Sequence, residues 1–145
     1  MKKSNILLLS ALGLTMLVIL AGAIFLRVNV LRPAVTGDNN IISQTRSLNT
    51  FSSINVTGPF VVSFTQGPGQ EVKVEADQNL MDKVITKVEG QELKVFPSEH
   101  IYSNKLRLTI QLPRIVKLNL SSGAKFRTLS PINQDSLYVL TEAGS

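Results

Sequence analysis

Apolar and polar residues alternate strictly in two consecutive stretches between residues 106 and 126. Alternation with a period of two is typical of β-strands that bury one face and expose the other. Pro113 separates the two stretches, and the small residues 121–123 end the second one in a turn. We therefore predict two strands whose apolar side chains point into a core. These side chains are Leu106, Leu108, Ile110 and Leu112 in the first strand and Val116, Leu118 and Leu120 in the second.

The same alternation occurs upstream, interrupted by turn-forming residues. Gly67-Pro68-Gly69 separates two such runs, which predicts a hairpin. Residues 77–82 break the pattern, and Asp77 or Asn79 is expected to cap a single helical turn there. The predicted upstream strands cover residues 51–56, 60–65, 71–76, 84–88 and 93–96.

A short repeat follows these strands. The spacing of Val116, Leu118, Leu120 and Gly123 recurs 21 residues later, at Leu137, Val139, Thr141 and Gly144. One short strand and one glycine turn per repeat is typical of a solenoid whose coils stack strand on strand. A sandwich with two similar hairpins gives the same pattern. Because the sequence stops within the second unit, we expect the domain to be incomplete at its C-terminus.

The N-terminal segment has a different character. Residues 6–26 carry no charge, and as a helix they reach about 31 Å, the hydrocarbon thickness of a bilayer. They form either a secretory signal, with Ala21-Gly22-Ala23 as the cleavage site, or an uncleaved signal anchor, which the length of the run favours. Both alternatives export the rest of the chain. We expect a signal segment over residues 1–27, a flexible linker over residues 28–47 and one β domain over residues 48–145.

Positive charge is concentrated in one part of the chain. The net charge is +5, and residues 105–127 contain six basic residues and no acidic one. Such a surface attracts anions, so Arg107, Lys117 and Lys125 are candidate contacts for an anion or a glycan. The alternative is that these side chains line the wet faces of strands and discourage aggregation. Aromatic residues do not alternate with the charges, so we expect no nucleic-acid partner.

Residues suited to catalysis are scarce. The chain has no cysteine and a single histidine, His100, so disulfides, thiolate metal sites and histidine dyads are not predicted. Asp77 and Asp82 flank the predicted helical turn, where we interpret them as a cap and a solvated residue. The sequence therefore predicts no catalytic residue, metal site or cofactor.

Several ordered blocks of sequence resemble one bacterial family. Together they cover about residues 48–145, and the resemblance rests on their order more than on any one block. The chain resembles the family called the putative auto-transporter adhesin head domain, or GIN domain, of the DUF2807 type. The blocks are Phe51-x-x-Ile54-x-Val56-x-Gly58, residues 64–67, residues 72–77, residues 79–84, residues 90–95, and Leu112-Pro113-x-Ile115-x-x-Leu118-x-Leu120-Ser121-Ser122-Gly123-Ala124.

The resemblance implies an all-β domain similar to a right-handed β-helix, displayed outside the cytoplasmic membrane of bacteria. It brings no established catalytic residues. We therefore expect a non-enzymatic module of the cell envelope, either anchored in the inner membrane or exported to the surface, that contacts an envelope glycan or protein. Two alternatives remain: a carbohydrate-active enzyme such as a polysaccharide lyase, and a membrane-tethered sensor or regulatory domain.

Overall fold

The computed structural model describes residues 3–29 and 33–142. The chain divides into two compact units, Met1–Pro33 and Ala34–Ser145. The first contains the helix α1 (Lys3–Asn29), whose sequence is largely apolar throughout its central part. Within it, Leu8–Val28 is long and apolar enough to cross a membrane, and a signal sequence near the N-terminus has the same character.

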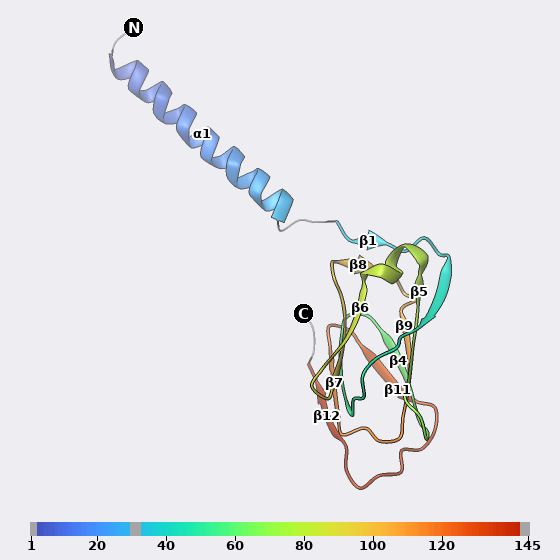
Figure 1. Cartoon of the computed structure of the whole chain (residues 1–145). Coiled ribbons are helices and arrows are strands. Elements are labelled where there is room, and N and C mark those ends of the chain that lie inside the picture. The colour runs from blue at the N-terminus through green and yellow to red at the C-terminus, as the bar shows by residue number, and fades with distance from the viewer. Residues whose placement is uncertain (1–2, 30–32, 143–145) are drawn as a thin grey trace. The chain divides into compact units, whose positions relative to one another are not determined.

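The second unit consists of strands and one short helix (Figure 1). The helix η1 (Gln78–Lys83) has 3-10 geometry. The strands are β1 (Val35–Thr36), β2 (Ile41–Thr45), β3 (Ser53–Thr57), β4 (Val61–Gln66), β5 (Glu71–Asp77), β6 (Val84–Glu89), β7 (Glu92–Pro97), β8 (Ile101–Tyr102), β9 (Arg107–Leu112), β10 (Lys117–Ser121), β11 (Lys125–Thr128) and β12 (Tyr138–Thr141). The prediction of a β domain preceded by an apolar helix is confirmed.

The described strands of the domain form two five-stranded sheets and one small pair. Sheet I has the order β12-β10-β3-β7-β6, and sheet II has the order β11-β4-β9-β5-β2. Within each sheet the central strands pair in parallel, whereas β6, β5 and β2 pair in antiparallel fashion. The strands β1 and β8 form a separate parallel pair.

One apolar core lies between the two sheets. The inward side chains alternate with outward ones along each strand, for example Ile54 and Val56 on β3 and Leu108 and Ile110 on β9, all with no exposed surface. Removing this apolar surface from water provides the main stabilisation of the domain. The two sheets leave their polar faces outward, where a ligand can reach them.

The 21-residue repeat appears as a register between strands. In the parallel pair of β10 and β12, Leu118 lies opposite Val139 and Leu120 lies opposite Thr141. A second correspondence spans 64 residues, because β10 also pairs with β3 and β11 pairs with β4 at that offset. Three residues connect β3 to β4, and three connect β10 to β11, so each connection turns the chain from sheet I to sheet II. In the second connection Gly123 has a positive φ of 85°.

The predicted hairpin between residues 60–65 and 71–76 is wrong. The strands β4 and β5 both pair with β9, which lies between them. The connection at residues 67–70 crosses over β9, where the Gly67 amide donates to the Leu112 carbonyl at 3.0 Å. A Cβ atom at Gly67 would lie 2.8 Å from the Gln111 side chain, so glycine permits this close crossing.

The stretch at residues 106–126 forms the two predicted strands, β9 in sheet II and β10 in sheet I, and differs from the prediction at one position. Val116, expected in the core, is 46% exposed, whereas Ile115 is fully buried. The chain turns between β9 and β10, so the alternation is interrupted at residues 113–116 and resumes at Lys117, with Leu118 and Leu120 buried as predicted.

The range expected as a flexible linker contains β1 and β2. The strand β2 extends sheet II by pairing with β5, and the Val35 amide donates to the His100 carbonyl at 2.9 Å. A linker over residues 28–47 is therefore corrected: residues 34–47 belong to the folded unit. Residues 30–32 lie outside the described part of the chain.

Asp77 occupies the N-cap position of η1 but makes no capping hydrogen bond with its side chain. Its carboxylate, 1% exposed, accepts instead from the Asn39 amide at 2.8 Å and from the Ser103 hydroxyl at 2.5 Å. A Cβ atom at Gly37 would overlap the same carboxylate. Asp77 thus fastens residues 37–39 to the domain, because its two oxygens satisfy donors from two separate segments.

Candidate functional site

The outer face of sheet II carries a row of basic side chains at the start of its parallel strands. Arg107 on β9 and Lys125 on β11 both lie opposite Val61 on β4. Both basic residues are exposed, and Val61 is half-buried between them. Neighbouring strands are about 4.8 Å apart, so the two positive side chains start roughly 10 Å from one another. We call Arg107, Lys125 and Arg127 the basic strip.

Arg127 extends this strip along β11. It lies two residues beyond Lys125, on the same face, and opposite Ser63 on β4. Its Nε donates to the Ser63 Oγ at 2.8 Å, which holds the guanidinium along the sheet. Sequence reasoning did not include Arg127 among the candidate contacts, although its spacing of two from Lys125 already placed both on one face.

On the β5 side of the basic strip, an acidic side chain lies next to Arg107. Glu75 on β5 lies opposite Arg107, and its carboxylate is 3.4 Å from the Lys73 ammonium. Ile41, Glu75, Lys105 and Arg107 line a depression of about 250 Å³. The Lys105 Nζ donates to the Asn39 side chain at 2.9 Å. The uncompensated positive charge therefore lies toward β4 and β11.

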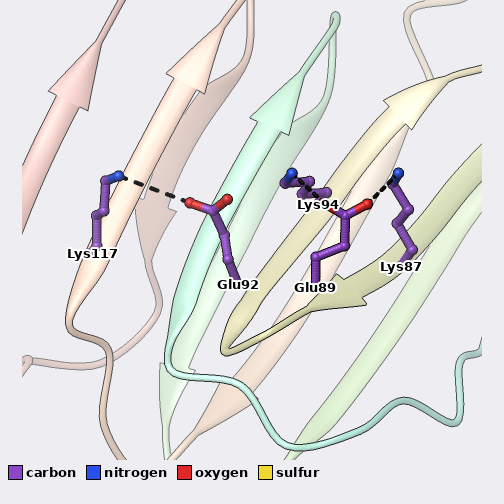
Figure 2. A network of polar contacts seen from close by, with 5 residues as sticks. All are labelled: Lys87, Glu89, Glu92, Lys94 and Lys117. Atoms are coloured by element: carbon purple, nitrogen blue, oxygen red, sulfur yellow. Dashed lines mark hydrogen bonds and ion pairs between the residues drawn. The ribbon is translucent and has the colours of Figure 1, made fainter.

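Lys117 lies elsewhere. It is on β10 in sheet I, and its ammonium is 3.9 Å from the Glu92 carboxylate, across Ser53 of β3. Figure 2 shows this pair beside a second group, Lys87, Glu89 and Lys94. The structure thus brings Arg107 and Lys125 together on one sheet and places Lys117 on the other.

The charges of β6 and β7 compensate one another along β6, between Lys87 and Glu89, and diagonally across the strands, between Glu89 and Lys94. Their register places Lys87 opposite Lys94 and Glu89 opposite Glu92, which alone would be repulsive. Glu89 relieves this by pairing with both lysines, each at 2.5 Å. Hydrogen bonds from Lys87 and Lys94 lower the pKa of Glu89 to about 2, and the bond to Glu89 raises the pKa of Lys94. This group is exposed, so salt screens it.

Two adjoining depressions lie on the outer side of sheet I and at its corner. One of about 330 Å³ is lined by the side chains of Asn55, Thr57, Lys94 and Phe96. The other, of about 570 Å³, is lined by the turns at residues 57–59, 97–101 and 122–123. Thr57 and Pro97 line both depressions, so the two adjoin at these residues. We call the two together the sheet I groove.

The described residues contain no group of three or more His, Cys, Asp or Glu side chains able to hold a metal ion. The two acids considered in the sequence analysis lie in different environments: Asp77 is buried and hydrogen-bonded, whereas Asp82 is exposed. His100 is exposed in the second depression. The arrangement is therefore suited to binding by charge and hydrogen bonding at two outer faces.

The domain matches one known protein family. Residues 50–145 match the model described as "Putative auto-transporter adhesin, head GIN domain", known as DUF2807. The chain belongs to this family. The matched range contains every described strand of sheets I and II except β2. No protein with a curated description matches the chain.

Solved structures share the fold of this GIN domain. A putative adhesin from Bacteroides fragilis NCTC 9343 aligns with a TM-score of 0.70 and 14% identity, over 77% of this chain and 54% of that one. A putative adhesin from Parabacteroides merdae ATCC 43184 gives 0.67 and 18%, over 76% and 47%. A putative lipid binding protein from Parabacteroides distasonis ATCC 8503 gives 0.59 and 19%, over 66% and 44%. The chain thus spans about half the length of these relatives. The family and the apolar helix fit a location in the cell envelope.

Proposed function

We propose that this GIN domain is a non-enzymatic binding module of the bacterial envelope that contacts an anionic envelope polymer through the basic strip. The observation that carries the proposal is the alignment of Arg107 and Lys125 on either side of Val61, within a family described as adhesin heads. Acidic residues are absent from β4 and β11, so nothing on these strands neutralises the strip. Envelope glycans that carry carboxylate or phosphate groups have the matching charge.

The anchoring of the module follows from α1. Leu8–Val28 has the length for one crossing of a bilayer, and Lys2 and Lys3 favour a cytoplasmic N-terminus. The domain is then held in the periplasm by an uncleaved anchor. If the segment is instead cleaved after Ala23, the domain is released or exported to the surface. In either case it meets envelope polymers, which are its proposed partners.

The proposed architecture is a β-helix-like stack of coils. The parallel pairs of β3 with β7 and with β10, and of β4 with β9 and with β11, support it. The coil of β3 and β4 comes first in the sequence. In the stack it lies between the coil of β7 and β9 and the coil of β10 and β11. Such a stack presents two broad faces, of which sheet II carries the basic strip.

A non-enzymatic role is supported by the engagement of the buried acid. Both oxygens of Asp77 accept hydrogen bonds from the protein, from the Asn39 amide and the Ser103 hydroxyl. A polysaccharide lyase or glycosidase requires acids and a base that converge on a substrate. Asp77 instead holds two segments of the fold together.

The proposal is tested by binding to polygalacturonate, an anionic glycan, with neutral dextran as the comparison. The full chain is kept in dodecylphosphocholine micelles, which have no sugar head group. We expect binding to polygalacturonate that weakens as salt rises. Changing Arg107→Ala together with Lys125→Ala should reduce the affinity about tenfold, because two exposed charges of the strip are lost. Lys117→Ala, which removes a paired lysine from sheet I, is the matched control. Equal affinity of the double variant and the native chain would overturn the proposal.

A further inference from the structure

The outer face of sheet I arranges polar side chains, two amides and one paired lysine, in a row that crosses the strands. Asn119 on β10, Asn55 on β3 and Lys94 on β7 are neighbours in register. Successive members of such a row are about 4.8 Å apart, the spacing of hydrogen-bonded strands. This spacing is close to the length of one pyranose unit in an extended glycan chain. A linear glycan lying across the strands would therefore meet one side chain per sugar.

A second row lies beside the first. Ser121 on β10 lies opposite Thr57 on β3, and their hydroxyl oxygens are 3.0 Å apart. Hydroxyl and amide groups both donate and accept hydrogen bonds, as sugar hydroxyls do. The two rows together present a polar track that runs into the sheet I groove at Asn55 and Thr57.

An aromatic ring closes this track on the β7 side. Phe96 is half-buried and lines the same depression as Asn55 and Thr57. The Lys87 ammonium lies over its ring, 5.4 Å from the centroid, so a sugar that stacks on the ring must move this exposed lysine aside. The electron-rich face of such a ring attracts the positive edges of C–H groups, which cover one face of many pyranoses. An apolar platform with a few polar groups is the usual composition of small-ligand sites.

The charges around the groove determine the ligand. Lys94 is paired with Glu89 at 2.5 Å, Lys117 with Glu92, and Glu99 with Lys83. Each of these charges is paired with an opposite one, and Glu89 is shared by Lys94 and Lys87. Beside the basic strip, by contrast, β4 and β11 carry no acid. A charged polymer would have to break such pairs, whereas a neutral one need not.

From these observations we propose that the sheet I groove binds a neutral, unbranched glycan that lies across β10, β3 and β7. This surface is separate from the basic strip and takes a ligand of different charge. At least three sugar units are needed to contact Asn119, Asn55 and Lys94 together. The affinity should therefore rise with the length of the oligosaccharide until the track is filled.

The test uses NMR titration of the full chain in dodecylphosphocholine micelles. The probes are the hexasaccharide and the disaccharide of β-1,4-linked N-acetylglucosamine and of β-1,4-linked glucose. We expect at least one hexasaccharide to bind more tightly than its disaccharide and to shift the amide signals of residues 55–57 and 94–97. Asn55→Ala should weaken this binding about threefold, the effect of one lost hydrogen bond. Phe96→Leu keeps apolar bulk at a half-buried position and should weaken it about fivefold through loss of the ring.

Two control variants separate this site from the basic strip. Thr109→Ala, on the outer face of sheet II, should leave hexasaccharide binding unchanged. Arg107→Ala with Lys125→Ala should also leave it unchanged while weakening polygalacturonate binding. The inference is overturned if neither hexasaccharide binds, if the shifted signals lie on sheet II, or if Asn55→Ala and Phe96→Leu both bind like the native chain.

Discussion

Leu118 lies opposite Val139 in the parallel pair of β10 and β12, and the two residues are 21 positions apart in the sequence. Their exposure nevertheless differs: Leu118 is 1% exposed and Val139 is 50% exposed. The core therefore ends, among the described strands, between β10 and β12. Equivalent positions in a sequence repeat need not contribute equally to stability.

This difference predicts unequal costs of truncation at the two positions. Leu118→Ala should lower the free energy of unfolding by about 2–5 kcal/mol, since it leaves a cavity in a packed core. Val139→Ala should cost less than about 1 kcal/mol, because half of the side chain remains in water. Urea unfolding of both variants, followed by circular dichroism, measures the costs. Equal costs would place the boundary of the core beyond β12.

Gly58 turns the chain between β3 and β4 with a φ of 114°, a conformation that residues with a Cβ atom rarely adopt. A Cβ atom there would also lie 3.2 Å from the Phe60 ring and from Pro97. We predict that Gly58→Ala costs about 2–3 kcal/mol of stability. Gly90→Ala is the matched control: its φ is 62°, no atom lies within 4 Å of the added Cβ, and the cost should be about 1 kcal/mol. The reverse order in thermal unfolding would contradict this account of the corner.

Because Asp77 holds residues 37–39 to the domain, we predict that one substitution at Asp77 releases the segment before β2. Asp77→Ala leaves the Asn39 amide and the Ser103 hydroxyl without their acceptor, which should cost about 3 kcal/mol. Hydrogen exchange at residues 37–40 should become much faster than in the native chain. Asp82→Ala, an exposed change within η1, should alter stability by less than about 0.5 kcal/mol. Unchanged exchange at residues 37–40 in Asp77→Ala would show that other contacts hold the segment.

The pairing of Glu89 predicts a pH dependence in acid. Its pKa is lowered from 4.5 to about 2, so the native state favours the charged form. The resulting stabilisation is fully present above pH 4.5 and is lost as the pH falls toward 2. Carbon-13 NMR of the Glu89 carboxyl should give a midpoint well below 4.5 at low salt, rising as salt is added.

Two lysine variants check the cause of this shift. Lys94→Ala combined with Lys87→Ala should return the Glu89 midpoint toward its ordinary value, because both hydrogen bonds are removed. Lys73→Ala, which changes a lysine on sheet II, should leave the midpoint in place. A native midpoint near 4.5 would contradict the pairing shown in Figure 2.

The local alternation of the sequence predicted most strands, because each strand buries one face against a common core. It did not predict which strands are neighbours. The residues at 67–70 form a glycine-rich turn like that of a hairpin, yet the turn passes over β9, which comes some 40 residues later. Such a parallel neighbour leaves no local signal. The strand β2 was missed for a different reason: as an edge strand, it buries only part of one face and is mostly polar.

The placement of the candidate residues on the sheets was predicted only in part, and their role stays a prediction. The concentration of basic residues in residues 105–127 identified Arg107 and Lys125, and both lie on sheet II. Lys117 lies in the same local pattern of alternation. The chain passes from sheet II to sheet I in the turn between β9 and β10, however, so Lys117 lies on the other sheet. Its pairing with Glu92 depends on strands that are distant in sequence. The sheet I groove likewise combines residues from β3 and β7 that no single stretch of sequence contains.

The most direct test of the proposed binding role maps the contact of polygalacturonate on the full chain. In dodecylphosphocholine micelles, NMR signals of the backbone and of the arginine Nε groups are compared with and without the polymer. We expect the largest shifts at Arg107, Lys125 and Val61, with Arg127 also affected. Signals of residues 92–94 and 117–119 on sheet I should change little. Shifts centred on sheet I, or none at saturating polymer, would rule out binding through the basic strip.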